Sequence, residues 1–295
     1  MKLLLSLFCV ISITHLSSAQ SKEQQVQQAN LLRAAYNSGS REKLDTFFEN
    51  WSRETPSLSD SAIEKSSDTI RNACKVFQQF YNPLNIQRSG GSEWGNDIYK
   101  KVKYLVIQKE ISIGFVDTLD GDLLLRRAAD EYIGNPSEKD SLIKAYWTNN
   151  EGFRRIYIHW PRARTYRKVP NFRPRLSFSY PKAVMLTNFY DALLNAFLGN
   201  KHVPFATGSI MAPARSKGES QERQQFLENC IRIFYGHWGG YWQLYSYPVV
   251  STITFDKDFS NALIEYRMVY EGGEAYLKKV HGAWTLIGAQ RTWIE

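Results

Sequence analysis

One stretch of the chain concentrates basic and aromatic side chains of the kind that bind anions. Between Glu151 and Asp191 there are nine basic residues and no acidic one. Guanidinium groups donate paired hydrogen bonds to phosphate, sulfate or carboxylate, and aromatic rings stack on bases or sugar faces. The segment indicates a surface for an anionic ligand, or else solvated strands whose charges are balanced by acids elsewhere. The predicted ligand-binding residues are Trp160, Arg162, Arg164, Tyr166, Arg167, Lys168, Arg173 and Arg175.

A second cluster is an aromatic belt at 234–247, with the sequence FYGHWGGYWQLYSY. Tyr and Trp combine an apolar body with a polar tip, which suits recognition of a sugar or small ligand. They equally suit the packing of a loop over a sheet. His237 is the residue in the belt whose pKa suits general acid–base catalysis, although a single His beside a Trp is more often structural. We predict no catalytic residue, and His237 comes nearest to one.

Motifs of established chemistry do not occur in the sequence. It has no HExxH, no P-loop, no GxSxG elbow, no GxGxxG after a strand and no zinc-type Cys/His spacing. The acids Asp117, Asp120 and Asp122 lack the EF-hand spacing and are interpreted as a hairpin tip rather than a calcium site. We therefore expect no metal and no cofactor. Whether the protein is an enzyme stays open, and the sequence leans against it.

Polar residues on the C-terminal predicted strands offer few further candidates for a site. Glu265 and Arg267 share the strand face opposite Tyr266, and a cross-strand ion pair would explain them without catalysis. Arg291 is the third polar candidate. Buried apolar residues are predicted on the other face, at Ala262, Ile264, Tyr266, Met268 and Tyr270.

The N-terminus is typical of a signal peptide. Lys2 is followed by an apolar run from Leu3 to Ile13, and Ser17-Ser18-Ala19 supplies the small residues of a cleavage site. We predict cleavage after Ala19 and a secreted or periplasmic protein with no transmembrane segment in the mature chain. The alternative is an N-terminal membrane anchor. Cleavage leaves two cysteines, Cys74 and Cys230, which we interpret as buried free thiols rather than a disulfide.

Composition and capping signals together indicate a folded α+β chain. The protein has 295 residues, of which 43% are hydrophobic, and a net charge of +8; these values exclude a disordered or fibrous protein. Capping signals place helix starts at Ser40, Ser61, Thr187 and Ser216, with a stop at Gly199. The predicted helices cover 22–81, 188–198 and 217–235. Predicted strands cover 103–117, 249–255, 261–271, 274–280 and 284–294, with hairpin turns at Asp120-Gly121 and Gly272-Gly273 and a further turn at His281-Gly282.

The run from Ile253 to Trp293 resembles the last strands of the NTF2-like, or SnoaL-like, cone fold. The matching features are a basic strand end, a Gly-containing turn, then Trp and an apolar residue: Lys278, Lys279, Gly282, Trp284 and Leu286. The resemblance implies a helix over a curled antiparallel sheet, with the preceding helix 217–235 as that cover. The whole chain also resembles uncharacterised secreted proteins of Bacteroidota-like bacteria, which implies a bacterial origin and no particular activity.

These inferences divide the chain into a signal peptide at 1–19, a helical region at 20–88, a β-rich basic region at 89–205 and an NTF2-like domain at 216–295. The favoured function is non-catalytic binding of a ligand or partner: an anionic glycan, a lipid headgroup or an acidic protein, with nucleic acid less favoured. The alternative is a small-molecule enzyme, of hydrolase or isomerase type, that uses a pocket in the C-terminal cone. The oligomeric state is left open.

The anion-surface hypothesis gives a chromatographic prediction. Retention on a heparin-like or phosphate resin should fall as salt rises, because salt screens charge contacts. It should also fall when Arg162, Arg164 and Arg167 are replaced together by Ala. Retention that is unchanged in the triple variant would contradict the hypothesis.

Overall fold

The computed structural model describes residues 22–90, 95, 97–146, 156, 158–199, 214, 216–235 and 242–294. The predicted signal peptide and its cleavage point lie outside the described residues. The class is α+β, as predicted. The helices are α1 (Lys22–Asn37), α2 (Arg41–Glu54), α3 (Asp60–Glu64), α4 (Asp68–Phe80), α5 (Gly121–Tyr132), α6 (Pro136–Ala145), α8 (Asn188–Leu198) and α9 (Lys217–Leu227), with a 3-10 turn η1 (Ile86–Ser89).

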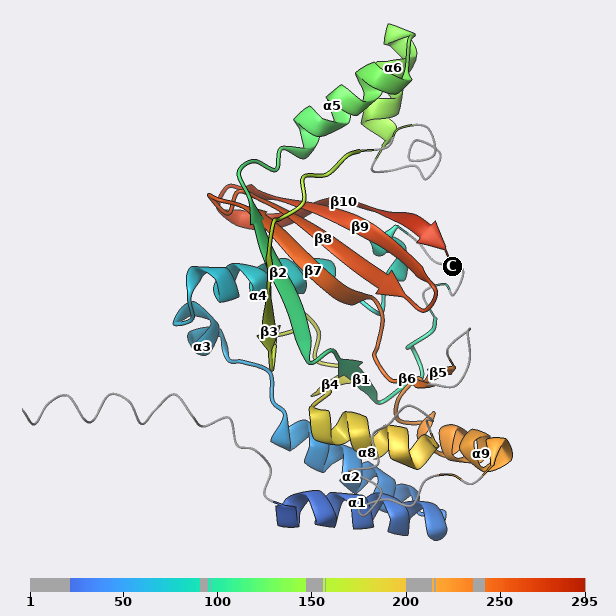
Figure 1. Ribbon diagram of the computed structural model, residues 1–295. Coiled ribbons are helices and arrows are strands. Elements are labelled where there is room, and N and C mark those ends of the chain that lie inside the picture. The colour runs from blue at the N-terminus through green and yellow to red at the C-terminus, as the bar shows by residue number, and fades with distance from the viewer. Residues whose placement is uncertain are drawn as a thin grey trace, which may run out of the picture.

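The strands form one large sheet and two small ones. Their bounds are β1 (Tyr104–Ile107), β2 (Glu110–Val116), β3 (Tyr166–Pro170), β4 (Lys182–Met185), β5 (Phe234–Tyr235), β6 (Trp242–Gln243), β7 (Val249–Asp256), β8 (Asn261–Met268), β9 (Glu271–Val280) and β10 (Ala283–Ile294). The six-stranded sheet has the order β10-β9-β8-β7-β2-β3, and within it β2 and β7 run parallel. Figure 1 shows this sheet in the middle, with α5 and α6 at one end and α1, α2, α8 and α9 at the other.

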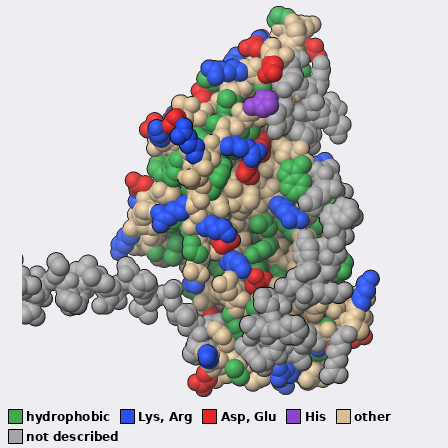
Figure 2. Space-filling view, viewed as in Figure 1, with side chains coloured by type: hydrophobic (Ala, Val, Ile, Leu, Met, Phe, Trp, Pro, Cys, Tyr) green, Lys and Arg blue, Asp and Glu red, His purple; other side chains and the backbone are tan. Residues whose placement is uncertain are grey.

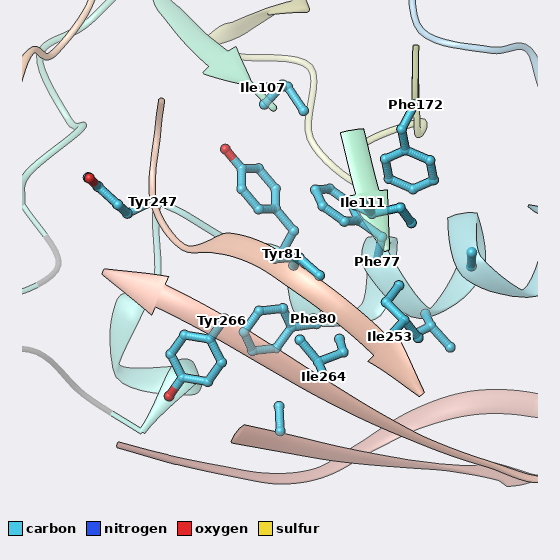
Figure 3. Packing of buried hydrophobic residues seen from close by; sticks show 14 of the residues in the cluster. Phe77, Phe80, Tyr81, Ile107, Ile111, Phe172, Tyr247, Ile253, Ile264 and Tyr266 are labelled. Atoms are coloured by element: carbon cyan, nitrogen blue, oxygen red, sulfur yellow. The ribbon is translucent and has the colours of Figure 1, made fainter. Parts of the chain in front are cut away.

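The inner face of the six-stranded sheet packs against α4. Ile113, Ile253 and Ile264 lie in one row across β2, β7 and β8, and all three are buried. Phe77 and Phe80 of α4 are fully buried in the same core, and Figure 3 shows them beside these strands. The predicted alternation is therefore confirmed, because Ala262, Ile264, Tyr266 and Met268 all point into this core.

A second core lies between α1, α2, α8 and the parallel pair β1–β4. Its centre is Trp51, which stacks on Tyr190 with ring centroids 4.4 Å apart and donates from its indole nitrogen to the Met185 carbonyl at 2.9 Å. A third, smaller core joins α5 and α6 to the chain around Ile156 and Ile158, on the outer side of the large sheet. Among the described residues, no helix is long and apolar enough to cross a membrane.

Helix starts encoded by a single capping side chain are mostly found where the sequence predicts them. Ser40, Thr187 and Ser216 each accept a hydrogen bond from a backbone N–H three residues on. Gly199 ends α8 in the left-handed region at φ 74°, where glycine carries no Cβ penalty. The predicted turn at His281-Gly282 also leads into β10.

Two helix predictions are wrong in extent. The helix predicted to begin at Ser61 is in fact two helices, α3 and α4, which are capped by Ser59 and Ser67. The helix predicted over 217–235 ends at Leu227, so that Cys230 lies in a turn and Phe234 in β5. The apolar residues there follow a helical spacing, but they enter two different cores, which a single helix face cannot do.

Both predicted hairpin turns are wrong. Asp120 caps α5, accepting from the N–H groups of Asp122 and Leu123, so the chain after this position is a helix and not the second strand of a hairpin. Asp117 and Asp122 instead pair with Lys257 and Lys278.

Gly272 and Gly273 lie inside β9, and the β8–β9 turn comes earlier, at Val269 and Tyr270. A Cβ on Gly272 would lie 2.1 Å from the Trp293 ring, and one on Gly273 would lie 2.1 Å from the Gln290 carbonyl. These glycines therefore serve close cross-strand packing rather than a turn.

The cover of the sheet also differs from the prediction. The implied cover was the helix at 217–235, but α4 packs on the inner face and Leu227 of α9 belongs to the second core. The division at 20–88, 89–205 and 216–295 stays a prediction. Strands from the last two of these regions pair directly, since β2 hydrogen-bonds to β7.

Both cysteines of the described chain are free and buried. Burial raises the pKa of the Cys74 thiol to about 11. It also raises the pKa of the Cys230 thiol, to about 12, with the nearby Asp45 carboxylate adding to the rise. Such thiols carry little reactive thiolate near neutral pH.

Trp51 gives a stability prediction for the second core. Trp51→Ala should lower the free energy of unfolding by about 3–5 kcal/mol, because it empties a fully buried site and leaves the Met185 carbonyl unpaired. Val26→Ala is the control, since Val26 is 46% exposed and its loss should change stability by less than about 0.5 kcal/mol. Urea denaturation of both variants measures the difference. Equal effects would contradict the assignment of Trp51 to the centre of this core.

Candidate functional site

The basic segment enters the large sheet as its edge strand. Residues 158–165 lead over the outer face of the sheet into β3, which pairs antiparallel with β2. Tyr166 lies opposite Gly114, and a Cβ on Gly114 would come within 2.7 Å of the Tyr166 ring. The absence of a side chain on Gly114 thus lets the ring lie on the sheet, where the Tyr166 and Thr254 hydroxyls share a hydrogen bond at 3.3 Å.

Beside Tyr166 the outer face is hollowed into a small cleft, which we call the outer cleft. Its volume is about 90 Å³. An engineered cavity of roughly 150 Å³ holds a benzene ring, so the outer cleft admits the edge of a ligand rather than a whole one. It is lined by Ile158, His159, Trp160, Pro161, Arg162, Tyr166, Thr254, Leu263, Glu265 and Glu274.

Two carboxyl groups of the outer cleft face each other. The β8–β9 register sets Glu265 directly opposite Glu274, and Thr252 donates its hydroxyl to Glu265 at 2.6 Å. Burial, followed by the negative charge of Glu265, raises the pKa of Glu274 to about 7; contact with Trp160 and the charge of Arg162 oppose the rise. Like charges directly opposite in a sheet repel, so Glu274 keeps its proton to a pH well above the ordinary carboxyl range.

Aromatic rings wall the outer cleft on two sides. Trp160 packs over Tyr276 with ring centroids 5.6 Å apart, which fixes the indole against the sheet. Tyr166 is 38% exposed and faces the solvent side of the cleft. The arrangement therefore combines a carboxyl pair, a guanidinium and two aromatic surfaces within one hollow, a set able to hold polar groups and to exchange a proton.

The structure brings together only three of the predicted binding residues, namely Trp160, Arg162 and Tyr166. Lys168 pairs with Glu110 at 3.4 Å and Arg175 pairs with Asp60. Figure 2 shows basic side chains interspersed with acidic ones on the visible face.

The other predicted cations lie apart from the cleft. Arg167 alternates with Tyr166 along β3 and lies across from Ile113 of the inner-face row. The backbone of Arg173 accepts a hydrogen bond from Leu58, near α3. Arg164 is exposed, and its charge helps to lower the pKa of Asp117, after the stronger effect of Lys257.

The described part of the aromatic belt, at 234–235 and 242–247, contributes to packing. His237 lies outside the described residues. Tyr235 and Trp242 of the β5–β6 pair meet edge to face at 4.9 Å, and Trp242 donates to the Leu198 carbonyl at 3.0 Å. Among the described residues, no group of His, Cys, Asp and Glu is arranged to hold a metal ion.

The expected cross-strand ion pair at Glu265 is wrong. The residues across from Glu265 are Thr252 and Glu274, and those across from Arg267 are Val249 and Gly272. Arg291, the third polar candidate, forms an ion pair with the buried Glu271 at 2.9 Å.

Sequence reasoning missed Glu274 because it misplaced one turn. A turn at Gly272-Gly273 would set Glu265 across from Val280, whereas the turn at Val269 and Tyr270 sets it across from Glu274. The alternation along β8 puts Glu265 on the outer face, so a correct turn would have revealed the acid pair.

No family model, curated protein or solved structure matches the chain. The resemblance of 253–293 to the NTF2-like cone therefore stays a prediction. What can be inferred about function rests on the chemistry of the site.

The carboxyl pair predicts how stability depends on pH. The folded chain keeps a proton on Glu274 up to pH about 7, whereas the unfolded chain releases it near 4.5. Its contribution is thus fully present below pH 4.5 and is lost as pH rises through 7. Glu274→Gln should leave stability at pH 4 nearly unchanged and raise it at pH 8 by at most about 3 kcal/mol.

Urea denaturation at pH 4 and pH 8 measures this effect. Glu131→Gln, at an exposed position of α5, serves as the matched control and should behave like the wild type at both values. A Glu274→Gln variant that loses stability at pH 8 would show that the carboxylate is stabilising instead.

Proposed function

We propose that this chain is a secreted, non-catalytic binding protein whose outer cleft holds the edge of a small hydroxyl-rich ligand of the sugar type. The observation that carries the proposal is the facing pair Glu265 and Glu274 between aromatic walls. Carboxyl oxygens accept from adjacent ligand hydroxyls, and a ring such as Trp160 stacks on the apolar face of a sugar. Arg162, at the same cleft, supplies donors for a ligand oxygen.

The acid pair directs the choice of ligand away from a polyanion. A sulfated or phosphorylated ligand would be repelled by Glu265, and several cations of the basic segment already have acidic partners. A purely cationic ligand would instead meet Arg162. A neutral ligand with many hydroxyl groups can hydrogen-bond to Glu265, Glu274 and Arg162, and it brings no charge of its own that would need a partner.

The same pair also supports a second candidate, a small-molecule enzyme of hydrolase or isomerase type. With a pKa of about 7, Glu274 can take up and release a proton at neutral pH, beside a second carboxyl group. Hydrolysis of a nitrophenyl glycoside that Glu274→Gln abolishes would favour the enzyme over the binding protein.

Binding is measured by ligand-observed NMR with methyl β-glucoside and methyl β-galactoside as probes. We expect a Kd on the order of a millimolar for at least one probe, typical of a ligand held by one edge. Glu265→Gln and Trp160→Ala should each weaken binding at least about fivefold, because each removes a ligand contact. Arg175→Ala is the matched control and should leave the Kd unchanged, since Arg175 pairs with Asp60 away from the cleft.

Two outcomes would overturn the proposal. One is the absence of binding to either probe by the wild-type chain. The other is retention on heparin that depends on Arg162 together with no response to the sugars, which would restore the anionic ligand.

A further inference from the structure

A second hollow lies where the aromatic belt meets α8 and β7, away from the outer cleft. Its volume is about 250 Å³. We call it the belt pocket, and its wall includes Asp191, Trp242, Gln243, Leu244, Tyr247 and Val249. Most of this wall is apolar or aromatic with a few polar groups, the composition typical of small-molecule sites.

The wall of the belt pocket includes one side-chain amide, that of Gln243. Gln243 is 9% exposed and its backbone pairs with Phe234. Within the part of the chain that the structure describes, neither end of its side-chain amide has a hydrogen-bond partner. The amide is therefore free to bond to a molecule held in the pocket.

The acid in the wall does not demand a cationic ligand. Asp191 accepts from Lys109 on one carboxylate oxygen at 2.9 Å and from Asn195 on the other at 2.7 Å. Its charge is therefore balanced within the protein. The Gln243 amide, by contrast, offers one acceptor and two donors, which match the complementary atoms of another amide.

We propose that the belt pocket binds a small uncharged molecule with an aromatic body and an amide-type head, the head bonding to Gln243. The size agrees with this ligand class. The pocket exceeds the roughly 150 Å³ cavity that binds benzene, which leaves space for a ring and a short polar head. Trp242 and Tyr247 supply aromatic surface against the ring.

The test uses phenylacetamide as the probe in ligand-observed NMR with the full chain. The expected Kd is on the order of a millimolar or tighter. Gln243→Leu should weaken binding at least about fivefold, and Val249→Trp should abolish it by filling the pocket. Gln79→Leu, at an exposed position of α4, is the matched control and should leave the Kd unchanged.

A thermal-stability measurement separates a binding role from a structural one. Because no hydrogen bond of the described chain involves the Gln243 amide, its removal breaks no bond, and Gln243→Leu should be about as stable as the wild type. The proposal is overturned if Gln243→Leu is destabilised with binding intact, or if the wild type does not bind. Tighter binding of phenylacetate than of phenylacetamide would overturn the uncharged head. Because Glu265→Gln should not affect this site, failure here leaves the outer cleft untouched.

Discussion

The two-stranded parallel sheet β1–β4 is the constraint on which the packing of this chain depends. Its strands are buried on both faces and alternate their side chains between two cores. Tyr104 and Val106 enter the core around Trp51, while Leu105 and Ile107 enter the core under α4. Since a slip of one residue would exchange the two sets, this register is fixed by both cores at once. The large sheet and the helical layer are thereby held against one another, and the belt pocket forms where they meet.

In the same arrangement, the outer face of the large sheet is not part of the hydrophobic core under α4. With α4 covering the inner face, the opposite side can carry polar groups such as Thr252, Glu265 and Glu274. A carboxyl pair at opposite sheet positions costs stability above pH 7, which a purely structural surface would have no reason to retain. Small residues permit the aromatic cover: Gly114 lies beneath Tyr166, and Gly121 lies beside Tyr276.

The sequence predicts the helix start correctly at three of the four positions where one side chain decides the outcome, the exception being Ser61. Ser40, Thr187 and Ser216 cap helices because the hydroxyl and its N–H partner lie three residues apart. The hairpin turn predicted at Asp120-Gly121 is wrong because an Asp before a Gly is equally typical of a hairpin turn and of a helix cap. The turn predicted at Gly272-Gly273 is wrong because these glycines are needed for close packing against the neighbouring strand, Gly272 beneath Trp293. The local sequence does not reveal that contact. The parallel pairing of β2 with β7 joins segments almost half the chain apart, such as Ser112 and Thr252, and has no local signal. The candidate site is therefore only partly predictable: the basic segment and Glu265 are found from the sequence, but Glu274 is not.

The central claim is that Glu274, which faces Glu265 across the sheet, holds its proton to near neutral pH and contacts a ligand. It is tested most directly by carbon-detected NMR titration of the glutamate carboxyl groups, with and without saturating methyl β-glucoside. The account predicts that Glu274 titrates near pH 7 in the free protein and that the sugar shifts this value. A Glu274 carboxyl that titrates near its ordinary pKa of 4.5 and does not respond to the sugar would contradict it.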